Sequence, residues 1–264
     1  MILETLERLA SSRAALQGLA MGLFLVVAVA LPRTKGQPMV NRDTLINLAT
    51  GALMFVVSIT VVKAISARLA FGLIPVAWLP QGWMQFLFSF LALDFMRYWL
   101  HYADHRVPLL WKFHRVHHSS ERLDATSGLR MHLVDFFQLI TLPLLLFTVL
   151  FDASALAPWV VPAAMGVGVV FDAFEHSNIR FDYGHPVLRG WGRVFNNPHF
   201  HSWHHTRDAV LCDGNYGNSL TVWDQLFGTD VTRPSSPEHL GLDASQALDN
   251  SVIGLQLLRP RRGT

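Results

Sequence analysis

Long apolar stretches separated by short polar segments occupy the first two thirds of the chain, and they predict membrane-spanning helices. A helix needs roughly 20 mostly apolar residues to cross a bilayer, so we expect an all-α, multi-pass membrane bundle of about four or five spans. The predicted spans are residues 16–32, 45–65, 84–100, 133–151 and 155–173. The short link at residues 152–154 predicts that the last two spans form a tight hairpin.

The first apolar stretch is open to two interpretations. Residues 19–30 resemble the core of a signal peptide, and Ala28-Val29-Ala30 resembles a cleavage site. The segment before it is long and carries Glu4 and Glu7, which favours an uncleaved membrane anchor.

Positive charge is concentrated in two of the connecting segments. These residues are Arg33, Lys35 and Arg42 after the first span, and Arg106, Lys112, Arg115, Arg122 and Arg130 after the third. The link between the last two spans has no Lys or Arg. Because positive loops mark the cytoplasmic side of a membrane, we expect both basic segments to face the cytoplasm. In a bacterium the membrane would be the cell inner membrane.

Composition agrees with a membrane protein and excludes several other classes. Hydrophobic residues make up 51% of the chain and charged residues only 15%, whereas soluble domains carry about 25% charged residues. A net charge of +2, without basic runs interleaved with aromatic residues, gives no indication of nucleic-acid binding. The single cysteine, Cys212, excludes an internal disulfide framework and a cysteine-rich metal site.

Histidine is the residue type that indicates chemistry. Of 13 histidines, all but His239 lie between His101 and His205. Two runs share the spacing H-x-x-H-H, and one pair has the spacing H-x-x-x-H. Residues at i, i+3 and i+4 share one face of a helix, so each run should converge. With His176 after the fifth predicted span, the candidate metal ligands are His101, His105, His114, His117, His118, His176, His201, His204 and His205.

Nine imidazoles exceed the needs of one metal ion, since a catalytic zinc uses three protein ligands and a structural zinc four. The number therefore indicates a histidine-rich site for two metals, in a helical cap on the cytoplasmic side of the bundle. Imidazole suits zinc, copper, iron and nickel, and spacing does not choose among them. The signatures H-E-x-x-H and E-x-x-H are absent from the sequence.

Acidic residues near these histidines are candidates for hydrogen bonding to the outer ring nitrogens. Asp94 lies seven residues before His101 on the same helix face. It is therefore expected to accept a hydrogen bond from the second ring nitrogen of a histidine, or otherwise to pair with Arg97. Glu175, directly before His176, is a candidate for the same reason.

The arrangement of the histidines resembles the fatty acid hydroxylase/sterol desaturase superfamily of integral-membrane di-iron oxygenases. Three histidine boxes occur in that family's order, at residues 101–105, 114–118 and 201–205, and His176-Ser177-Asn178 resembles its additional histidine. The resemblance covers residues 84–230, the predicted catalytic domain. Residues 1–83 would then be N-terminal membrane helices, and residues 231–264 a polar surface tail.

One segment departs from the family pattern. Members often carry R-x-H-P-x-E after the second box, whereas this chain reads Arg130-Met131-His132-Leu133-Val134-Asp135. The proline is missing and the acid is shorter. His132 and Asn178 join Asp94 and Glu175 as candidates to support the ligands.

The resemblance implies two iron ions held by the nine histidines. It implies O2-dependent hydroxylation or desaturation of a C–H bond in a lipid, such as a fatty acyl chain or a sterol-like molecule. No residue beyond the ligands is required as a nucleophile or general base, because the metals carry the chemistry.

The electrons must come from another protein, because the sequence has neither G-x-G-x-x-G nor Cys-x-x-Cys. We expect a separate reduced carrier of the ferredoxin or reductase type. Two alternatives remain open: a membrane zinc-dependent lipid hydrolase, which would leave most of the histidines unused, and a catalytically silent scaffold. The sequence does not choose the lipid, the position oxidised or the oligomeric state.

Overall fold

The regular structure is helical throughout the part of the chain that the computed structural model describes. That part comprises residues 2–66 and 72–261, with side chains from residue 13 to 57 and from 72 to 261. Within it the β-bridges are isolated and build no sheet, so the predicted all-α class is confirmed. The α-helices are α1 (Ile2–Ala30), α2 (Arg42–Ser66), α3 (Trp83–Arg106), α4 (Pro108–His114), α5 (Leu133–Phe136), α6 (Leu142–Leu150), α7 (Val160–Glu175), α8 (Pro186–Gly192), α9 (Pro198–His204), α10 (Val222–Phe227) and α11 (Val252–Gln256).

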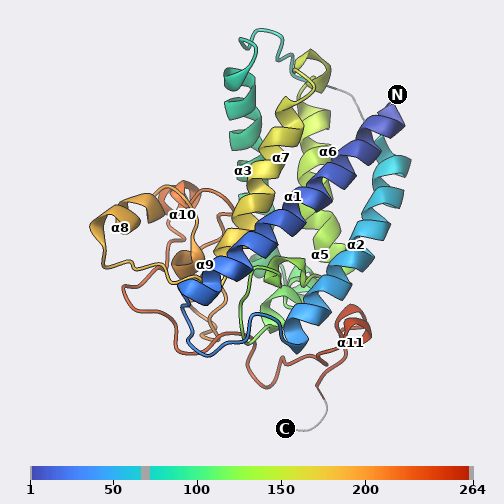
Figure 1. The fold of residues 1–264 in the computed structure, drawn as a ribbon. Coiled ribbons are helices and arrows are strands. Elements are labelled where there is room, and N and C mark those ends of the chain that lie inside the picture. The colour runs from blue at the N-terminus through green and yellow to red at the C-terminus, as the bar shows by residue number, and fades with distance from the viewer. Residues whose placement is uncertain (1, 67–71, 262–264) are drawn as a thin grey trace.

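The long helices form a bundle, and the short ones gather with the loops at its lower end (Figure 1). Helix α7 packs against both α1 and α3, and α3 also contacts α6. The core between α3, α6 and α7 includes Leu93, Phe147 and Val160, all buried. Burying each such side chain stabilises the fold by roughly 1.5–3 kcal/mol.

Local sequence explains where the central helices begin and end. Gly82, with φ of 85°, precedes α3, and such a backbone conformation favours glycine. Val107 is extended and Pro108 opens α4, because the residue before a proline avoids the helical region and proline suits the first helical turn. Helices α5 and α6 are joined by a π-helical turn at Phe137–Thr141.

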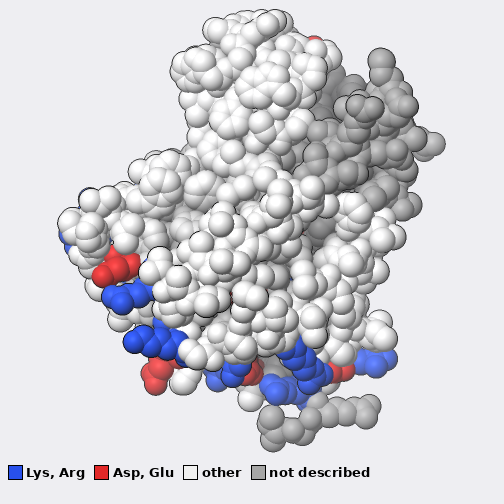
Figure 2. All heavy atoms as spheres, viewed as in Figure 1, with Lys and Arg blue, Asp and Glu red and all other residues white. Residues whose placement is uncertain are grey.

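Two helical segments are long and apolar enough to cross a membrane, Arg13–Ala30 and Leu133–Leu150. The charged residues lie on the lower end of the face shown in Figure 2, and the surface above them is nearly free of charge. Large apolar side chains are exposed on the bundle, among them Leu19 and Val26 on α1 and Leu87 on α3. An exposed apolar surface of this kind suits contact with lipid.

All five predicted spans fall on helices, although the number that cross a membrane remains a prediction. The fifth begins at Val160, later than the predicted residue 155. Leu156 is extended and Pro158 follows it, and a proline excludes a regular helix through that point.

Residues after 230 were predicted to form a surface tail, and part of this segment packs onto the protein. Leu248 and Leu255 are buried against Val116. The buried guanidinium of Arg130 donates a hydrogen bond to Asn250 Oδ1 at 2.7 Å. Apolar residues spaced along this polar segment, with hydrogen bonds such as that of Arg130, therefore hold it against the histidine-bearing region.

Candidate metal centre

The nine candidate histidines come from four separate parts of the chain and meet below the bundle. His101 and His105 occupy the last two turns of α3, and His176 caps the C-terminal end of α7. The others lie at the end of α4, in the turn that follows it, and on α9 with its C-cap. All nine side chains are buried, with at most 9% of each residue exposed.

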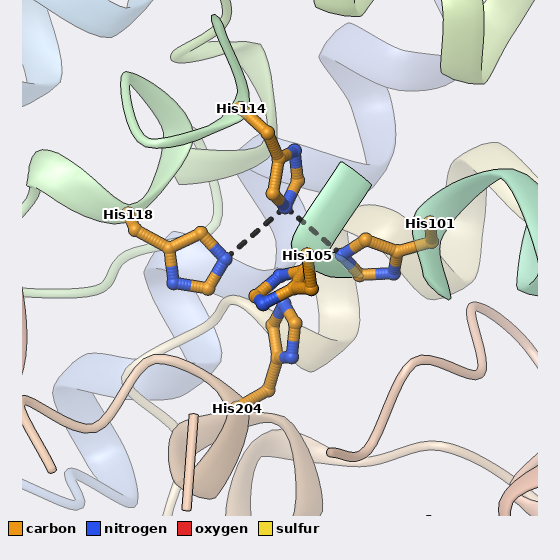
Figure 3. A group of neighbouring side chains, drawn as sticks. All are labelled: His101, His105, His114, His118 and His204. Atoms are coloured by element: carbon orange, nitrogen blue, oxygen red, sulfur yellow. Dashed lines mark hydrogen bonds between the residues drawn. The ribbon is translucent and has the colours of Figure 1, made fainter. Parts of the chain in front are cut away.

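Five of these histidines form the first group, shown in Figure 3. It consists of His101, His105, His114, His118 and His204, each offering one ring nitrogen within 4.8 Å of the others. The Nε2 atoms of His101 and His118 each lie 3.1 Å from Nε2 of His114. Two nitrogens bound to one ion at roughly 2.1 Å and at right angles would be about 3 Å apart.

The other four form the second group, which consists of His117, His176, His201 and His205. Nε2 of His176 lies 3.2 Å from that of His117 and 3.0 Å from that of His201. The two groups adjoin, since the ring centroids of His118 and His205 are 4.5 Å apart. The arrangement therefore offers two neighbouring positions for metal ions.

The expectation that each H-x-x-H-H run converges on one point needs a correction. His117 belongs to the second group, whereas His114 and His118 belong to the first, and His204 is separated in the same way from His201 and His205. Residues at i+3 and i+4 lie about 100° apart around a helix axis. A single helical turn can therefore direct adjacent histidines towards two different ions.

Hydrogen bonds from the outer ring nitrogens determine which nitrogen carries the proton. Nδ1 of His101 lies 2.9 Å from the Tyr216 carbonyl oxygen, and Nδ1 of His204 lies 2.8 Å from that of Gly214. A carbonyl only accepts, so Nδ1 is the donor and Nε2 keeps a lone pair. Nε2 of His101 then faces Nε2 of His114, whose own Nδ1 donates to Asp135. When His114 is neutral, two lone pairs at 3.1 Å cannot form a hydrogen bond, and either a metal ion between them or a proton on His114 Nε2 satisfies both. The residues present therefore fit a metal ion.

Electrostatics also favour ligation by neutral imidazoles. Burial lowers the pKa of His118 and of His205 well below the ordinary value, and neighbouring histidines lower both further. Burial likewise lowers the pKa of His204 to about 3. His114 differs: burial opposes its charge, but the charge of Asp135 and its hydrogen bond raise the pKa above the usual value. A metal ion would compete with a proton for this ring.

The four predicted supporting residues have different contacts. Glu175 lies 3.7 Å from His176 Nδ1 and 4.0 Å from His201 Nδ1. Asn178 instead links the loop after α1, accepting from the Thr34 backbone N–H at 3.0 Å. His132 caps α5, where its Nδ1 accepts from Val134 N–H at 3.1 Å.

Asp94 makes its hydrogen bonds with residues other than a histidine, and its charge interacts with that of Arg97, the alternative partner that the sequence offered. Its Oδ1 accepts from Ser219 N–H at 3.0 Å and its Oδ2 from Trp223 Nε1 at 2.9 Å. It thus holds the loop that follows Tyr216 instead of bonding a histidine directly. Since the Tyr216 carbonyl accepts from His101, Asp94 affects the first group only through that loop.

Two carboxylates that contact candidate ligands were not predicted from the sequence. Asp135 Oδ1 lies 3.0 Å from His114 Nδ1, with both side chains fully buried. Asp213 Oδ1 lies 3.2 Å from His105 Nδ1. In the sequence, Asp135 was notable only because it stands where the family motif R-x-H-P-x-E has glutamate. Nothing in the sequence indicated Asp213.

Gly217 is expected to be essential to the loop that presents the Tyr216 carbonyl. A Cβ at this position would overlap the Leu220 carbonyl oxygen and lie 2.9 Å from Asp224 Oδ2. We expect Gly217→Ala to destabilise the protein by about 1–3 kcal/mol, the usual cost of overpacking. Thermal unfolding in detergent measures this change. Gly190→Ala is the control, because no heavy atom lies within 4 Å of its added Cβ; equal unfolding temperatures for the two variants would contradict the expectation.

Comparison with known proteins places this constellation in a family. The model of the fatty acid hydroxylase family matches residues 86–229, a range that includes all nine histidines. The chain belongs to this family. The superfamily resemblance drawn from the histidine boxes is therefore confirmed. No solved structure matches the chain significantly.

Curated relatives of this family member include several lipid-modifying enzymes. It is 29% identical to the alkylglycerol monooxygenase of Xenopus tropicalis over 204 residues, covering 75% of this chain and 42% of that protein. It is 31% identical to an ornithine lipid hydroxylase of Rhizobium tropici, covering 60% of this chain and 47% of that protein. For the lathosterol oxidase of Rattus norvegicus the identity is 29%, covering 61% and 51%. The chain thus spans about half the length of these relatives or less.

Proposed function

We propose that the protein is a membrane-bound di-iron oxygenase that uses O2 to hydroxylate, or desaturate, a C–H bond of a lipid. The observation that carries this proposal is the pair of adjoining groups of buried imidazoles, five in one and four in the other. A single catalytic zinc uses three protein ligands, so a one-zinc hydrolase would leave most of these side chains without a function.

The names of the relatives support the same chemistry. They are a monooxygenase, a hydroxylase and an oxidase, and the compounds in their names are alkylglycerol, ornithine lipid and lathosterol. All three are lipids. We infer that this chain is an oxidoreductase acting on a lipid, with an acyl or alkyl chain or a sterol-like ring as the class of substrate.

Two iron ions, when bound, would supply the redox chemistry that activates O2. The residues of the chain hold and orient that centre. The backbone carbonyls of Tyr216 and Gly214 and the carboxylate of Asp135 accept hydrogen bonds from the Nδ1 atoms of His101, His204 and His114, which leaves the Nε2 atoms of these candidate ligands available. Burial excludes water from the ring nitrogens. In hydroxylation, one O2, two electrons and two protons convert C–H to C–OH and release one water.

The remaining parts of the proposal concern the membrane and the electrons. We propose a multi-pass protein whose histidine end faces the cytoplasm, as the positive loops indicate. The charged lower end in Figure 2 agrees with one aqueous face and an apolar body. The two electrons would arrive from a separate reduced carrier of the ferredoxin or reductase type, docking at that aqueous face.

Metal content and O2 consumption of detergent-purified protein test the proposal. We expect about two iron ions per chain and O2 uptake after reduction with dithionite, with both lost after chelation and restored by ferrous iron. Bound zinc in place of iron and no O2 uptake, after expression in iron-supplied cells, would refute the oxygenase and favour the lipid hydrolase.

A further inference from the structure

Large apolar side chains are exposed on two short helices beside the bundle, α8 and α10. In α8, Val187 and Trp191 are four residues apart and share one face of the helix, and Val187 is 70% exposed. In α10, Leu226 is 69% exposed and the adjacent Phe227 is exposed as well. We call these four side chains the α8–α10 patch. Apolar surface of this kind indicates a site of interaction with a protein or a membrane.

Hydrogen bonds join the two helices into one layer. Thr221 Oγ1 donates to the Gly192 carbonyl oxygen at 3.0 Å, and the Thr221 N–H donates to the Val194 carbonyl oxygen at 3.1 Å. Gln225 Nε2 donates to the Arg193 carbonyl oxygen at 2.5 Å. The end of α8 is therefore fixed to α10, and one connected layer presents the apolar side chains of both helices.

The α8–α10 patch continues onto the outer surface of α3. The ring centroid of Phe227 lies 4.9 Å from that of Trp99 and 6.2 Å from that of Phe95. Both α3 side chains are exposed, as is Leu87 nearer the start of the helix, and all three belong to the predicted span at residues 84–100. Figure 1 shows α8 and α10 beside the bundle, and most charged side chains in Figure 2 lie at or below their level. The layer therefore lies where the uncharged surface of the bundle meets the charged end.

Helix α8 is amphipathic, with a basic face opposite the apolar one. Arg189 and Arg193 are exposed and four residues apart, and Arg189 lies about 200° around the helix axis from Val187. Short helices with tryptophan and aliphatic residues on one face and arginine on the other are typical of segments that lie in the plane of a membrane surface. The guanidinium groups of such helices face the lipid phosphates.

We propose that the α8–α10 patch lies in the headgroup region of the bilayer, with its four apolar side chains among the upper parts of the acyl chains and the two arginines at lipid phosphates. The lipid surface is the partner because the patch is continuous with the apolar surface of the bundle and because its basic border complements phosphate. The proposal rests on the membrane location proposed above and is independent of the reaction.

This placement would determine how deep the metal centre lies. Asp224 of α10 accepts hydrogen bonds from the backbone N–H groups of Tyr216 and Gly217, both at 2.8 Å. The Tyr216 carbonyl oxygen in turn accepts from Nδ1 of His101. A single loop thus connects α10 to the first group of histidines, so the depth of α10 in the bilayer sets the depth of His101.

Fluorescence quenching from the membrane and from water tests the placement. The dye nitrobenzoxadiazole is attached to Val187→Cys, Leu226→Cys or Val210→Cys in the full chain carrying Cys212→Ser, in phosphatidylcholine nanodiscs. Phosphatidylcholine with a nitroxide near the carbonyl end of its acyl chain quenches from the membrane, and iodide quenches from water. We expect quenching by the nitroxide lipid to be at least about threefold stronger at positions 187 and 226 than at 210, and quenching by iodide to be weaker.

Val210 is the matched control. It is apolar and 79% exposed, like the residues of the patch, but its neighbours Arg207 and Asp208 are charged and exposed. A second pair of variants tests the basic face. Arg189→Glu should weaken quenching by the nitroxide lipid at position 187 at least about twofold, because a carboxylate is repelled by lipid phosphates. Lys35→Glu, the same charge change in the exposed loop after α1, should leave it unchanged.

Three results would overturn the proposal. Iodide quenching at positions 187 and 226 as strong as at 210 would show that the patch faces water. Protection from both quenchers would show that another protein chain covers it. Unchanged quenching in a folded Arg189→Glu variant would exclude contact of the basic face with phosphate. Since positions 187 and 226 lie on different helices, failure of one variant to fold leaves the other to decide.

A label on α1 separates this proposal from the membrane location on which it rests. Val26 lies in a segment apolar enough to cross a membrane and is exposed. Quenching of labelled Val26→Cys by the nitroxide lipid, without quenching at positions 187 and 226, would overturn the proposal and leave the membrane location standing. Lipid quenching at all three positions in a protein without O2 uptake would support the proposal and refute the oxygenase alone.

Discussion

Replacing His204 or His117 by alanine is expected to lower O2-dependent lipid oxidation by more than about a hundredfold, because loss of a ligand should exceed the 10–100-fold cost of losing a residue that supports one. His204 belongs to the first group and His117 to the second. Each variant should therefore lose one of the two proposed metal ions and retain the other. Iron analysis and O2 consumption of the purified variants measure both effects.

The matched control is His239→Ala. The His239 side chain is 65% exposed, so its removal should leave iron content and O2 consumption at wild-type levels. Wild-type iron content together with full turnover in His117→Ala would show that the second group binds no catalytic metal. The same result for His204→Ala would show that the first group binds no catalytic metal.

Asp135→Asn is expected to weaken metal binding by the first group about 10–100-fold. Asp135 Oδ1 lies 3.0 Å from His114 Nδ1, and neither side chain is exposed. An asparagine oxygen still accepts a hydrogen bond from Nδ1–H, so the tautomer is retained while the negative charge is lost. With a neutral hydrogen-bond partner at Nδ1, the His114 ring is less basic and its Nε2 binds a metal ion more weakly. Competition with a chelator of known affinity gives the change in the dissociation constant.

Asp182→Asn serves as the control for this prediction, since the Asp182 side chain is 53% exposed, pairs with the surface residue Arg180 and accepts a hydrogen bond from Gly184 N–H. Its metal affinity should equal that of the wild type. Equal affinities in Asp135→Asn and the wild type would mean that the carboxylate positions the His114 ring without strengthening it as a ligand.

Sequence reasoning predicted most of what depends on local periodicity. Each apolar stretch coincides with a helix, because a helix satisfies its own backbone hydrogen bonds and needs only an apolar surface to be buried or to face lipid. The histidine spacing likewise identified eight side chains, and the position of His176 after the fifth predicted span added a ninth; the structure brings all nine together in two groups.

The tertiary structure decided how the histidines are divided between the two groups and which residues hydrogen-bond to them. Sequence spacing could not show that His117 and His118 serve different groups, because the direction of each ring depends on where α4 ends and the next turn begins. The partners of His114 and His105 are 21 and 108 residues distant along the chain.

The sequence by itself therefore determined the helical class, the family and the identity of the candidate ligands, since these follow from composition and short-range spacing. Only the tertiary structure decided the division into two groups and the supporting carboxylates. The physical reason is that each of these depends on contacts between distant segments, which helix packing selects and local periodicity does not encode.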